Sequence, residues 1–286
     1  EAEVKLRVKT AYLQLQFANQ ILQQLKKQDS IYSQIANAAS RQFTAGQIDF
    51  VVKTYAATQY SEVHNRYVQA QTDMAVASQQ LQLYTGIADS ITPTPFVKGS
   101  TSLITADLQA DSTAIVNTPF IQYQSQAQTV AIKSLQLEKT KALPGFTLGY
   151  MNQGLRNTII PLRFSVGVNV PIWFWQYKAS ISAAQTNVEI THQNSLAQQQ
   201  TLTANLQQVK GDALKHQTSL AYYESTTLKQ ADDLITSSAR MFEAGQTDYI
   251  TYLRTLSDAF NIQVKYLETI RAFNQSTISL NYLIGK

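Results

Sequence analysis

The stretch FTAGQIDF at residues 43–50 returns as FEAGQTDY at residues 242–249, 199 positions later. The pairs that agree at this one offset extend well beyond the eight letters. They are Arg41/Arg240, Phe43/Phe242, Ala45/Ala244, Gly46/Gly245, Gln47/Gln246, Asp49/Asp248, Tyr67/Tyr266, Leu81/Leu280 and Gly86/Gly285. A gap-free register of this length is not expected by chance. The sequence therefore predicts an internal duplication, which has to be settled before any fold is assigned.

The repeated stretch has the chemistry of a tight turn between two antiparallel helices. Gly46 and Gly245 can adopt the left-handed conformation that closes a helix C-terminus. Asp49 and Asp248 follow three residues later, where a side-chain oxygen can cap the next helix. Turn chemistry is the plain physical cause of the motif, and it is compatible with a second role of these tips in contacting a partner.

Heptad spacing of small and apolar residues predicts long helices on both sides of each turn. The spacing alternates between four and three residues, which keeps one stripe facing a neighbouring helix in a left-handed crossing. The first stripe comprises Val4, Val8, Ala11, Leu15, Ala18, Leu22, Leu25, Asp29, Tyr32, Ala36, Ala39 and Phe43. The return helix has Ala56, Tyr60, Val63, Tyr67, Ala70, Met74, Ala77, Leu81 and Tyr84. The last helix has Ala259, Ile262, Tyr266, Thr269, Phe273, Ser276, Leu280 and Leu283.

Two further helices are expected between these hairpins. Thr118 and Pro119 form a helix start, and the helix that follows would use a stripe of Tyr123, Ala127, Val130, Ser134 and Leu137. From about residue 178 to 240 the chain has no proline and a single glycine, Gly211. That segment predicts one helix of roughly sixty residues, or about 90 Å.

Between these two helices the period changes to two, which predicts a β-hairpin over about residues 146–172. Apolar residues alternate with small polar ones, so that one face of each strand is apolar; these residues are Phe146, Leu148, Tyr150, Phe164, Val166, Val168 and Val170. Strands of about 9–11 residues cross a bilayer when tilted. The cluster of Trp173, Phe174, Trp175 and Tyr177 then fits either a membrane-interface girdle or the ordinary core of a sheet–helix junction.

The predicted fold class is mainly α, with long antiparallel coiled-coil helices and one β-hairpin. Residues 1–90 form a first helical hairpin, and 91–118 a linker with a short helix near 103–115. Residues 119–286 form the second repeat of helix, β-hairpin, long helix, turn at Gly245 and final helix. Moved back by 199, the β-hairpin falls before residue 1. The duplication therefore predicts that a first helix and a first β-hairpin lie upstream of this chain.

Composition narrows the function classes. Charged residues make up 15% and the net charge is +4 with scattered basic residues, so we expect no nucleic-acid partner. No apolar run is long enough for a transmembrane helix. The chain has no cysteine, and His64, His192 and His216 stand singly on helices, so we expect no metal site and no cofactor. No nucleophile elbow, phosphate loop or paired acidic motif suggests an enzyme.

At this point the chain resembles the TolC family of outer membrane efflux proteins. The resemblance covers essentially the whole chain and rests on four stretches: RQFTAGQIDF, RMFEAGQTDY, KALPGFTLGY, and GVNVPIWFW ahead of an Ala/Gln-rich helix. The Phe-x-x-Gly-x-x-Asp turn, present once in each half, is its most specific element. The ending SLNYLIGK is similar to a heavy-metal efflux subgroup.

The resemblance implies a homotrimeric export conduit for small molecules or metal ions. Each protomer would give four strands to a shared barrel in the outer membrane, and its helices would form an α-barrel across the periplasm. This chain supplies two strands, and six strands from a trimer are too few for an open pore. The family positions that can carry a carboxylate gate, six and nine residues after the second glycine, are Thr251 and Arg254 here, so the resemblance does not support such a gate.

The resemblance also implies partners. A periplasmic adaptor and an inner-membrane pump of the RND class would dock at the helical tips. The adaptor contact would comprise Gly46, Gln47, Asp49, Gly245, Gln246 and Asp248. The alternative function is a structural coiled-coil scaffold or an adhesive helical protein. It explains the heptads but not the alternating hairpin, and a scaffold should be soluble without detergent.

Overall fold

The computed structural model describes residues 1–87, 89, 91–94, 118–151, 163–170 and 174–285. The short helix expected near 103–115 and the side chains of Trp173 and Phe174 lie outside this description. The chain divides into two compact units, one of residues 1–111 with 205–286 and one of residues 112–204. The boundaries of these units differ from those of the sequence repeat, because both halves of the duplication contribute helices to the first unit.

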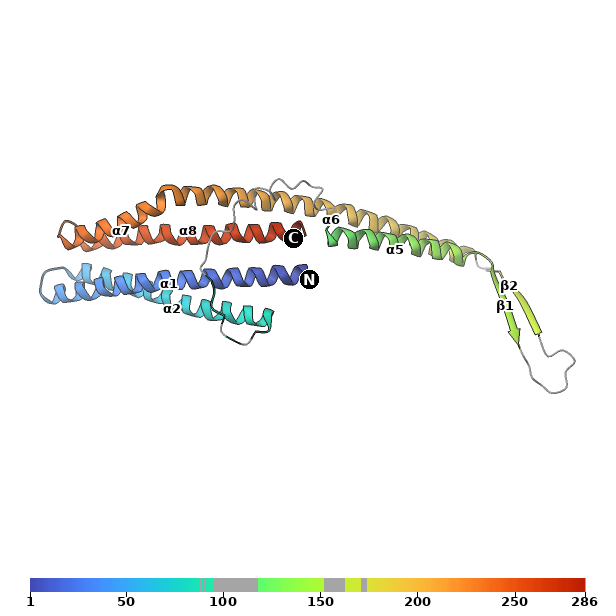
Figure 1. Cartoon of the computed structure of the whole chain (residues 1–286), viewed down its shortest axis with the longest axis horizontal. Helices are drawn as coiled ribbons and strands as arrows, with labels where there is room; N and C mark the ends of the chain where they lie inside the picture. The colour runs from blue at the N-terminus through green and yellow to red at the C-terminus, as the bar shows by residue number, and fades with distance from the viewer. Residues whose placement is uncertain (88, 90, 95–117, 152–162, 171–173, 286) are drawn as a thin grey trace. The chain divides into compact units, whose positions relative to one another are not determined.

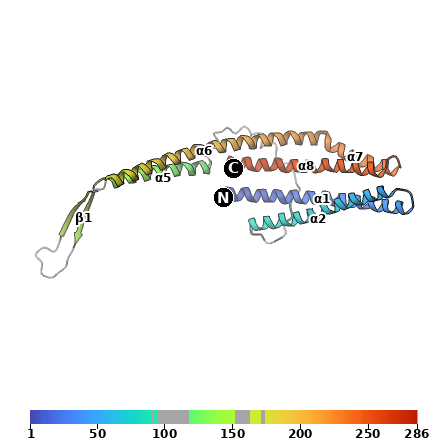
Figure 2. The same cartoon turned by 180° about the vertical axis from the view of Figure 1, so that it is seen from behind.

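The first unit contains two helical hairpins (Figure 1). Helices α1 (Ala2–Thr44) and α2 (Phe50–Thr85) form one hairpin, and α7 (Leu228–Glu243) and α8 (Tyr249–Leu283) form the other. Helix α1 also packs along α8, so the two hairpins lie side by side, as the opposite views of Figures 1 and 2 both show. The mainly α class with one β-hairpin is confirmed.

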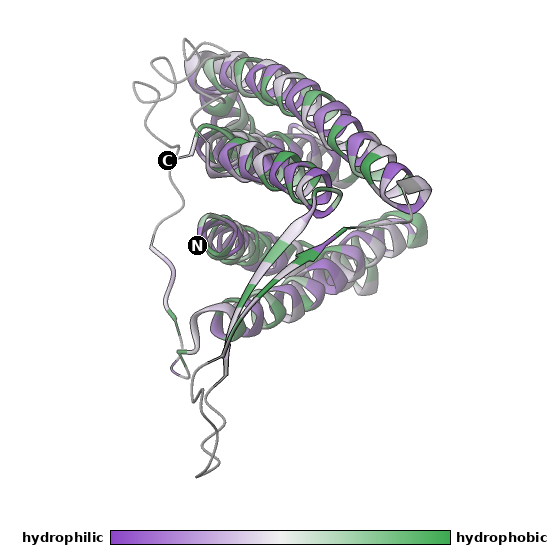
Figure 3. Ribbon diagram, turned by 90° about the vertical axis from the view of Figure 1, so that its right-hand side faces the viewer, coloured by the Kyte–Doolittle hydropathy of each residue, from purple (hydrophilic) through white to green (hydrophobic). Residues whose placement is uncertain are grey.

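Helix α2 meets α1 through a narrow seam of buried residues. Four of them are spaced by seven and are mostly alanine, namely Ala56, Val63, Ala70 and Ala77, and Leu81 extends the seam toward the end of the helix. Small side chains let the two backbones approach closely. Leu15 on the facing stripe of α1 is completely buried, which stabilises the fold by roughly 1.5–3 kcal/mol. Figure 3 shows that hydrophobic and hydrophilic residues alternate along the helices.

Helix α1 has a second buried stripe, whose residues are not part of the predicted heptad stripe. This second stripe packs against the other hairpin. Leu13 packs against Leu220, Ile270 and Phe273 from the second half of the chain. The heptad stripe predicts the partner across the turn, α2. The second stripe arises because α1 lies between α2 and α8 and buries residues on two of its sides.

The predicted long helix is present but contains a π turn. Helix α6 (Phe174–Tyr222) leads into η1 (Tyr223–Thr227), which leads into α7. At the end of η1 the N–H of Leu228 donates to the carbonyl of Tyr223, five residues back rather than four. Such a turn widens the helix locally and is frequent at functional sites. Nothing in the sequence pattern had predicted it.

The second unit contains α5 (Pro119–Lys141), which lies beside the first part of α6 in both views (Figures 1 and 2). The stripe predicted on α5 is wrong. Its residues Tyr123, Val130 and Leu137 are 69%, 64% and 56% exposed. The buried residue is Ala131, and Gln128 Nε2 lies 3.3 Å from His192 Nδ1 on α6. The buried stripe on α5 lies one residue after the predicted one, because α6 packs against the neighbouring face of α5.

The second unit also contains the β-hairpin. Strands β1 (Gly145–Met151) and β2 (Arg163–Asn169) pair antiparallel, with Leu148 opposite Val166. Each strand has seven residues in the described part of the chain, fewer than the 9–11 predicted. The predicted faces are present, because the register places apolar residues of the two strands opposite one another.

Candidate functional site

Both helical tips close with the same backbone hydrogen bonds. In the first tip, the N–H of Gly46 donates to the carbonyl of Phe43 and that of Gln47 donates to the carbonyl of Gln42, both at 2.9 Å. This pair of bonds is the Schellman motif, which needs a left-handed residue; Gly46 has φ of +71°. The second tip repeats it, with Gly245 bonded to Phe242, Gln246 bonded to Met241, and φ of +69° at Gly245. The glycines therefore cap helices, and both glutamines are exposed beside them.

The two aspartates of the tips differ. The Asp248 carboxylate accepts the N–H groups of Ile250 and Thr251 at 2.9 and 3.0 Å and the Thr251 hydroxyl at 2.7 Å. Asp49 makes no side-chain cap hydrogen bond. The position equivalent to Thr251 in the first tip is Val52, which has no hydroxyl to donate. Sequence reasoning gave both aspartates the same role, whereas only the second fulfils it.

These hydrogen bonds alter the titration of the second tip. The N–H and the hydroxyl of Thr251 both favour the ionised carboxylate, and together with the N–H of Ile250 they lower the pKa of Asp248 below its ordinary value. A negative charge at this position also interacts favourably with the N-terminus of α8. The second tip is therefore a closed, charge-stabilised turn.

The two tips also differ in how their aromatic side chains pack. Phe242 stacks on Tyr252 and meets Tyr249 edge-on, each at 4.6 Å between ring centroids. Both tyrosines are buried. In the first tip, Phe43 carries the Lys53 ammonium over its ring at 4.7 Å, and Phe50 is 63% exposed. The first tip thus presents an aromatic side chain to solvent where the second has buried its own.

A shared core lies behind both tips. It contains residues from α1, α2 and α8, namely Tyr32, Ile35, Ala39, Ala56, Val63, Tyr249, Tyr252, Leu253, Leu256 and Phe260. The Tyr32 hydroxyl donates to the carbonyl of Leu253 at 3.4 Å, and burial raises the pKa of Tyr32 to about 12. Tyr32 therefore stays neutral at physiological pH and acts in this core as a hydrogen-bond donor.

The β-hairpin presents two unlike faces, both exposed. One face carries large apolar residues with exposures from 54% to 83%: Phe146, Leu148, Tyr150, Phe164, Val166, Val168 and Val170. Over residues 145–149 and 165–169 the other face carries small uncharged residues, which are Gly145, Thr147, Gly149, Ser165, Gly167 and Asn169. An exposed apolar face of this kind requires a partner or lipid. Alternation of apolar and polar residues is the pattern of a membrane barrel strand.

The predicted aromatic cluster after β2 is only partly described. Trp175 is 67% exposed at the start of α6, and Tyr177 is half-buried. The exposure of Trp175 argues against a fully packed sheet–helix junction. It fits an interfacial indole ring better.

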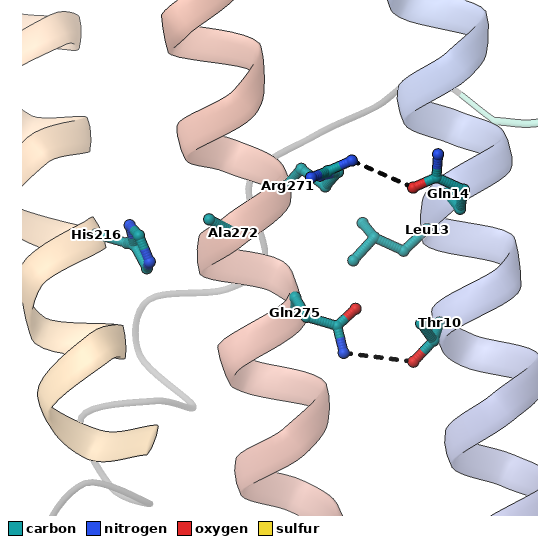
Figure 4. A pocket seen from close by; sticks show the side chains of 7 residues that line it. All are labelled: Thr10, Leu13, Gln14, His216, Arg271, Ala272 and Gln275. Carbon is teal, nitrogen blue, oxygen red and sulfur yellow. Dashed lines mark hydrogen bonds between the residues drawn. The ribbon is translucent and has the colours of Figure 1, made fainter. Parts of the chain in front are cut away.

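A polar groove of about 410 Å³ lies in the first unit between α1, α6 and α8 (Figure 4). Arg271 donates to the Gln14 amide oxygen at 3.3 Å, and Gln275 donates to the Thr10 hydroxyl at 3.4 Å. His216 of α6 points toward α8 beside these two hydrogen bonds (Figure 4). Both bonds link α8 to α1, so they connect the two helical hairpins.

The histidines have partners that spacing along one helix could not reveal. His64 Nδ1 on α2 lies 2.9 Å from the Asp29 carboxylate on α1. Within the described ranges, no three histidine, cysteine or acidic side chains converge as metal ligands. No helix in those ranges is long and apolar enough to cross a membrane.

Comparison by sequence finds no protein family and no curated protein that matches the chain. Comparison of structures finds outer membrane channels. The outer membrane channel CmeC of Campylobacter jejuni superposes with a TM-score of 0.86 at 13% identity, over 99% of this chain and 62% of that one. The outer-membrane channel OprN gives 0.86 at 12% identity, over 100% and 66% of the two chains. CusC, described for transmembrane channel formation, gives 0.80 at 16% identity, over 96% and 66%.

The chain thus spans about two thirds of the length of these channels. At such low identity the likeness concerns the fold alone. It agrees with the fold that the resemblance to the TolC family implied. The chain has the fold of outer membrane channel proteins.

Proposed function

We propose that this chain is the greater part of the outer membrane exit channel of a tripartite efflux system. The channel is a passive conduit for small molecules or metal ions, and the free energy for export comes from the partner pump. The observation that carries the proposal is the β-hairpin, whose apolar face is exposed at seven large residues while its opposite face carries small uncharged residues over 145–149 and 165–169. Lipid covers the first face and the aqueous lumen wets the second.

Three features support the rest of the assembly. The channels that share the fold supply the precedent for an outer membrane location. The exposed stripe of Tyr123, Val130 and Leu137 on α5 suits packing against a second copy in a homotrimer. The two tips, with Gln47 and Gln246 exposed, suit contact with a periplasmic adaptor that is coupled to an inner-membrane pump of the RND class.

The hairpin also sets how the protein sits in the membrane. Trp173, Phe174, Trp175 and Tyr177 follow β2, so they anchor the interface at the periplasmic side. The helices then occupy the periplasm. Two strands from each of three copies would not close an open pore, so the conduit forms from the full-length protein.

Conductance tests the proposal. The full-length protein, reconstituted in planar lipid bilayers, should give ion-conducting channels, and deletion of its gene should raise cellular retention of an exported dye or metal. A protein that stays monodisperse without detergent and gives no conductance would instead support the coiled-coil scaffold. Matched variants on the two hairpin faces, described in the Discussion, link the conductance to this segment.

A further inference from the structure

The groove between α1, α6 and α8 combines positive charge with room for a small molecule (Figure 4). Its volume of about 410 Å³ falls in the range of pockets that hold small organic molecules. Its described lining contains the guanidinium of Arg271 and the imidazole of His216, but no carboxylate. The carboxylates one turn away on these helices, Asp212 and Glu268, form no ion pair with either group in the described part of the chain. The positive charge of the groove is therefore not neutralised by these residues.

Arg271 is held in a defined orientation while most of its donors stay available. Its guanidinium carbon lies 4.5 Å from the centre of the Phe17 ring, and one N–H donates to the Gln14 amide oxygen at 3.3 Å. The ring and the amide set the plane of the guanidinium, which has five N–H donors in a fixed fork. The amide is neutral, so it leaves the charge uncompensated. Because Arg271 is also exposed, an anion can reach it from solvent.

The repeated fold does not require these polar groups. At the offset of 199, Arg271 and Gln275 of α8 correspond to Thr72 and Val76 of α2, which are exposed. The first repeat therefore forms its helical hairpin without a guanidinium at this position. The hydrogen bonds that Arg271 and Gln275 make to α1, at 3.3 and 3.4 Å, are longer than usual for an N–H donor and contribute little to the packing. The polar groove is thus a feature of the second copy that helix packing does not explain.

We propose that this groove binds a small organic carboxylate. The carboxylate accepts two parallel N–H bonds from the guanidinium of Arg271, the geometry in which arginine binds this group most strongly. The apolar body of the ligand lies against Leu13 and crosses Ala272, whose single methyl group leaves the floor of the groove open. It ends near the imidazole of His216, which points toward α8 from the far wall (Figure 4). Binding at this groove can be measured whether or not the protein conducts, so the inference does not rest on the proposed function.

Titration of the full-length protein in lipid nanodiscs with naphthoate tests the proposal. Naphthoate carries one carboxylate on a rigid apolar ring system, and naphthylmethanol has the same rings without the charge. Ligand-observed NMR should show saturable binding of naphthoate and about tenfold weaker binding of the alcohol, because the charge-assisted bonds are lost. Equal affinities for the two probes, or no saturable binding of naphthoate, would overturn the carboxylate site. Inorganic phosphate at matched ionic strength should not displace naphthoate, and displacement would refute the selection of an organic acid.

Substitutions inside and outside the groove locate the binding. Arg271→Met keeps a long side chain over Phe17 and should weaken naphthoate binding by about tenfold. Ala272→Leu removes no polar group but fills the floor of the groove, and it should weaken binding by a similar factor of about ten. Arg254→Met is the matched control, because Arg254 is an exposed arginine about five turns earlier on the same helix. It should change the affinity by less than about twofold. Equal effects of Arg271→Met and Arg254→Met would place the binding elsewhere.

Thermal unfolding of the same variants separates a binding role of Arg271 from a structural one. Arg271→Lys keeps the charge but loses the planar fork, so it should weaken naphthoate binding by about threefold. Its thermal midpoint should stay within about 2 °C of the unchanged protein, since an exposed polar contact contributes little to stability. If Arg271 serves only to connect α8 to α1, Arg271→Met should lower the thermal midpoint and leave the naphthoate affinity unchanged. That pair of results would refute the proposal.

Discussion

The Asp248 carboxylate accepts both the backbone N–H and the hydroxyl of Thr251, at 3.0 and 2.7 Å, whereas Asp49 in the duplicated position makes no such bond. One substitution in the duplication, Val52 in place of the threonine, accompanies this difference. Two copies of one turn have therefore become two different tips. The second tip is held by the hydrogen bonds between Asp248 and Thr251. The first tip leaves Phe50 exposed beside an aspartate that makes no side-chain cap bond.

Substituting the two tip aspartates should affect the two tips differently. Asp248→Ala should accelerate hydrogen exchange at the amides of residues 250 and 251 by roughly fivefold, because an N-cap hydrogen bond is lost. Asp49→Ala should change exchange at residues 51 and 52 by less than about twofold, since no cap bond exists there. Exchange followed by mass spectrometry on the full-length protein measures both. A similar acceleration at both tips would contradict the difference between them.

The second tip should also lose protection in acid. The pKa of Asp248 is lowered in the folded protein, so its stabilising contribution is fully present above the ordinary value of 3.8 and is lost as the pH falls through the lower folded pKa. Exchange at residues 250 and 251, corrected for the intrinsic pH dependence, should therefore rise below about pH 4. In Asp248→Asn, which cannot titrate there, this rise should be absent. A rise of equal size in the asparagine variant would assign the acid effect to another group.

The turn glycines should tolerate no side chain, for conformational rather than steric reasons. No atom lies within 4 Å of a Cβ built on Gly46 or Gly245, but both have φ near +70°. Alanine at either position should destabilise the fold by about 1–2 kcal/mol, measured by chemical unfolding of the full-length protein. Gly211→Ala is the matched control, because Gly211 lies inside α6 with open space around it and ordinary φ. That variant should be more stable by about 0.5–1 kcal/mol.

The two faces of the hairpin should respond oppositely to charge. Leu148→Lys places an ammonium on the apolar face and should destabilise the membrane-inserted protein by roughly 2–4 kcal/mol near the bilayer centre. Thr147→Lys, one residue earlier on the polar face, should leave assembly unchanged. Heat-stable oligomer on semi-native gels and bilayer conductance report both variants. Equal defects, or equal tolerance, would show that lipid does not cover the apolar face.

Much of this fold follows from local periodicity. Alternation in FTLGY and RFSVGVN placed both strands and their faces, and the glycines and aspartates of the tips placed both turns. These features depend on residues a few positions apart, whose geometry the backbone fixes on its own. The stripe on α1 is of the same kind, and Ala11, Leu15, Ala18, Tyr32 and Ala39 are buried along it.

Other features needed the tertiary structure, because they depend on segments far apart in the chain. The stripe chosen on α5 was wrong, since Tyr123 and Val130 are as apolar as a seam requires and only the position of α6 selects the neighbouring face. Leu13 is buried because α8 lies there, more than 250 residues away in sequence. The π turn is defined by the backbone hydrogen bond from Leu228 to Tyr223, which no residue spacing in the sequence indicates. The sequence by itself determined which segments are helix, strand and turn, because these depend on residues a few positions apart; the packing of remote segments decided which faces meet.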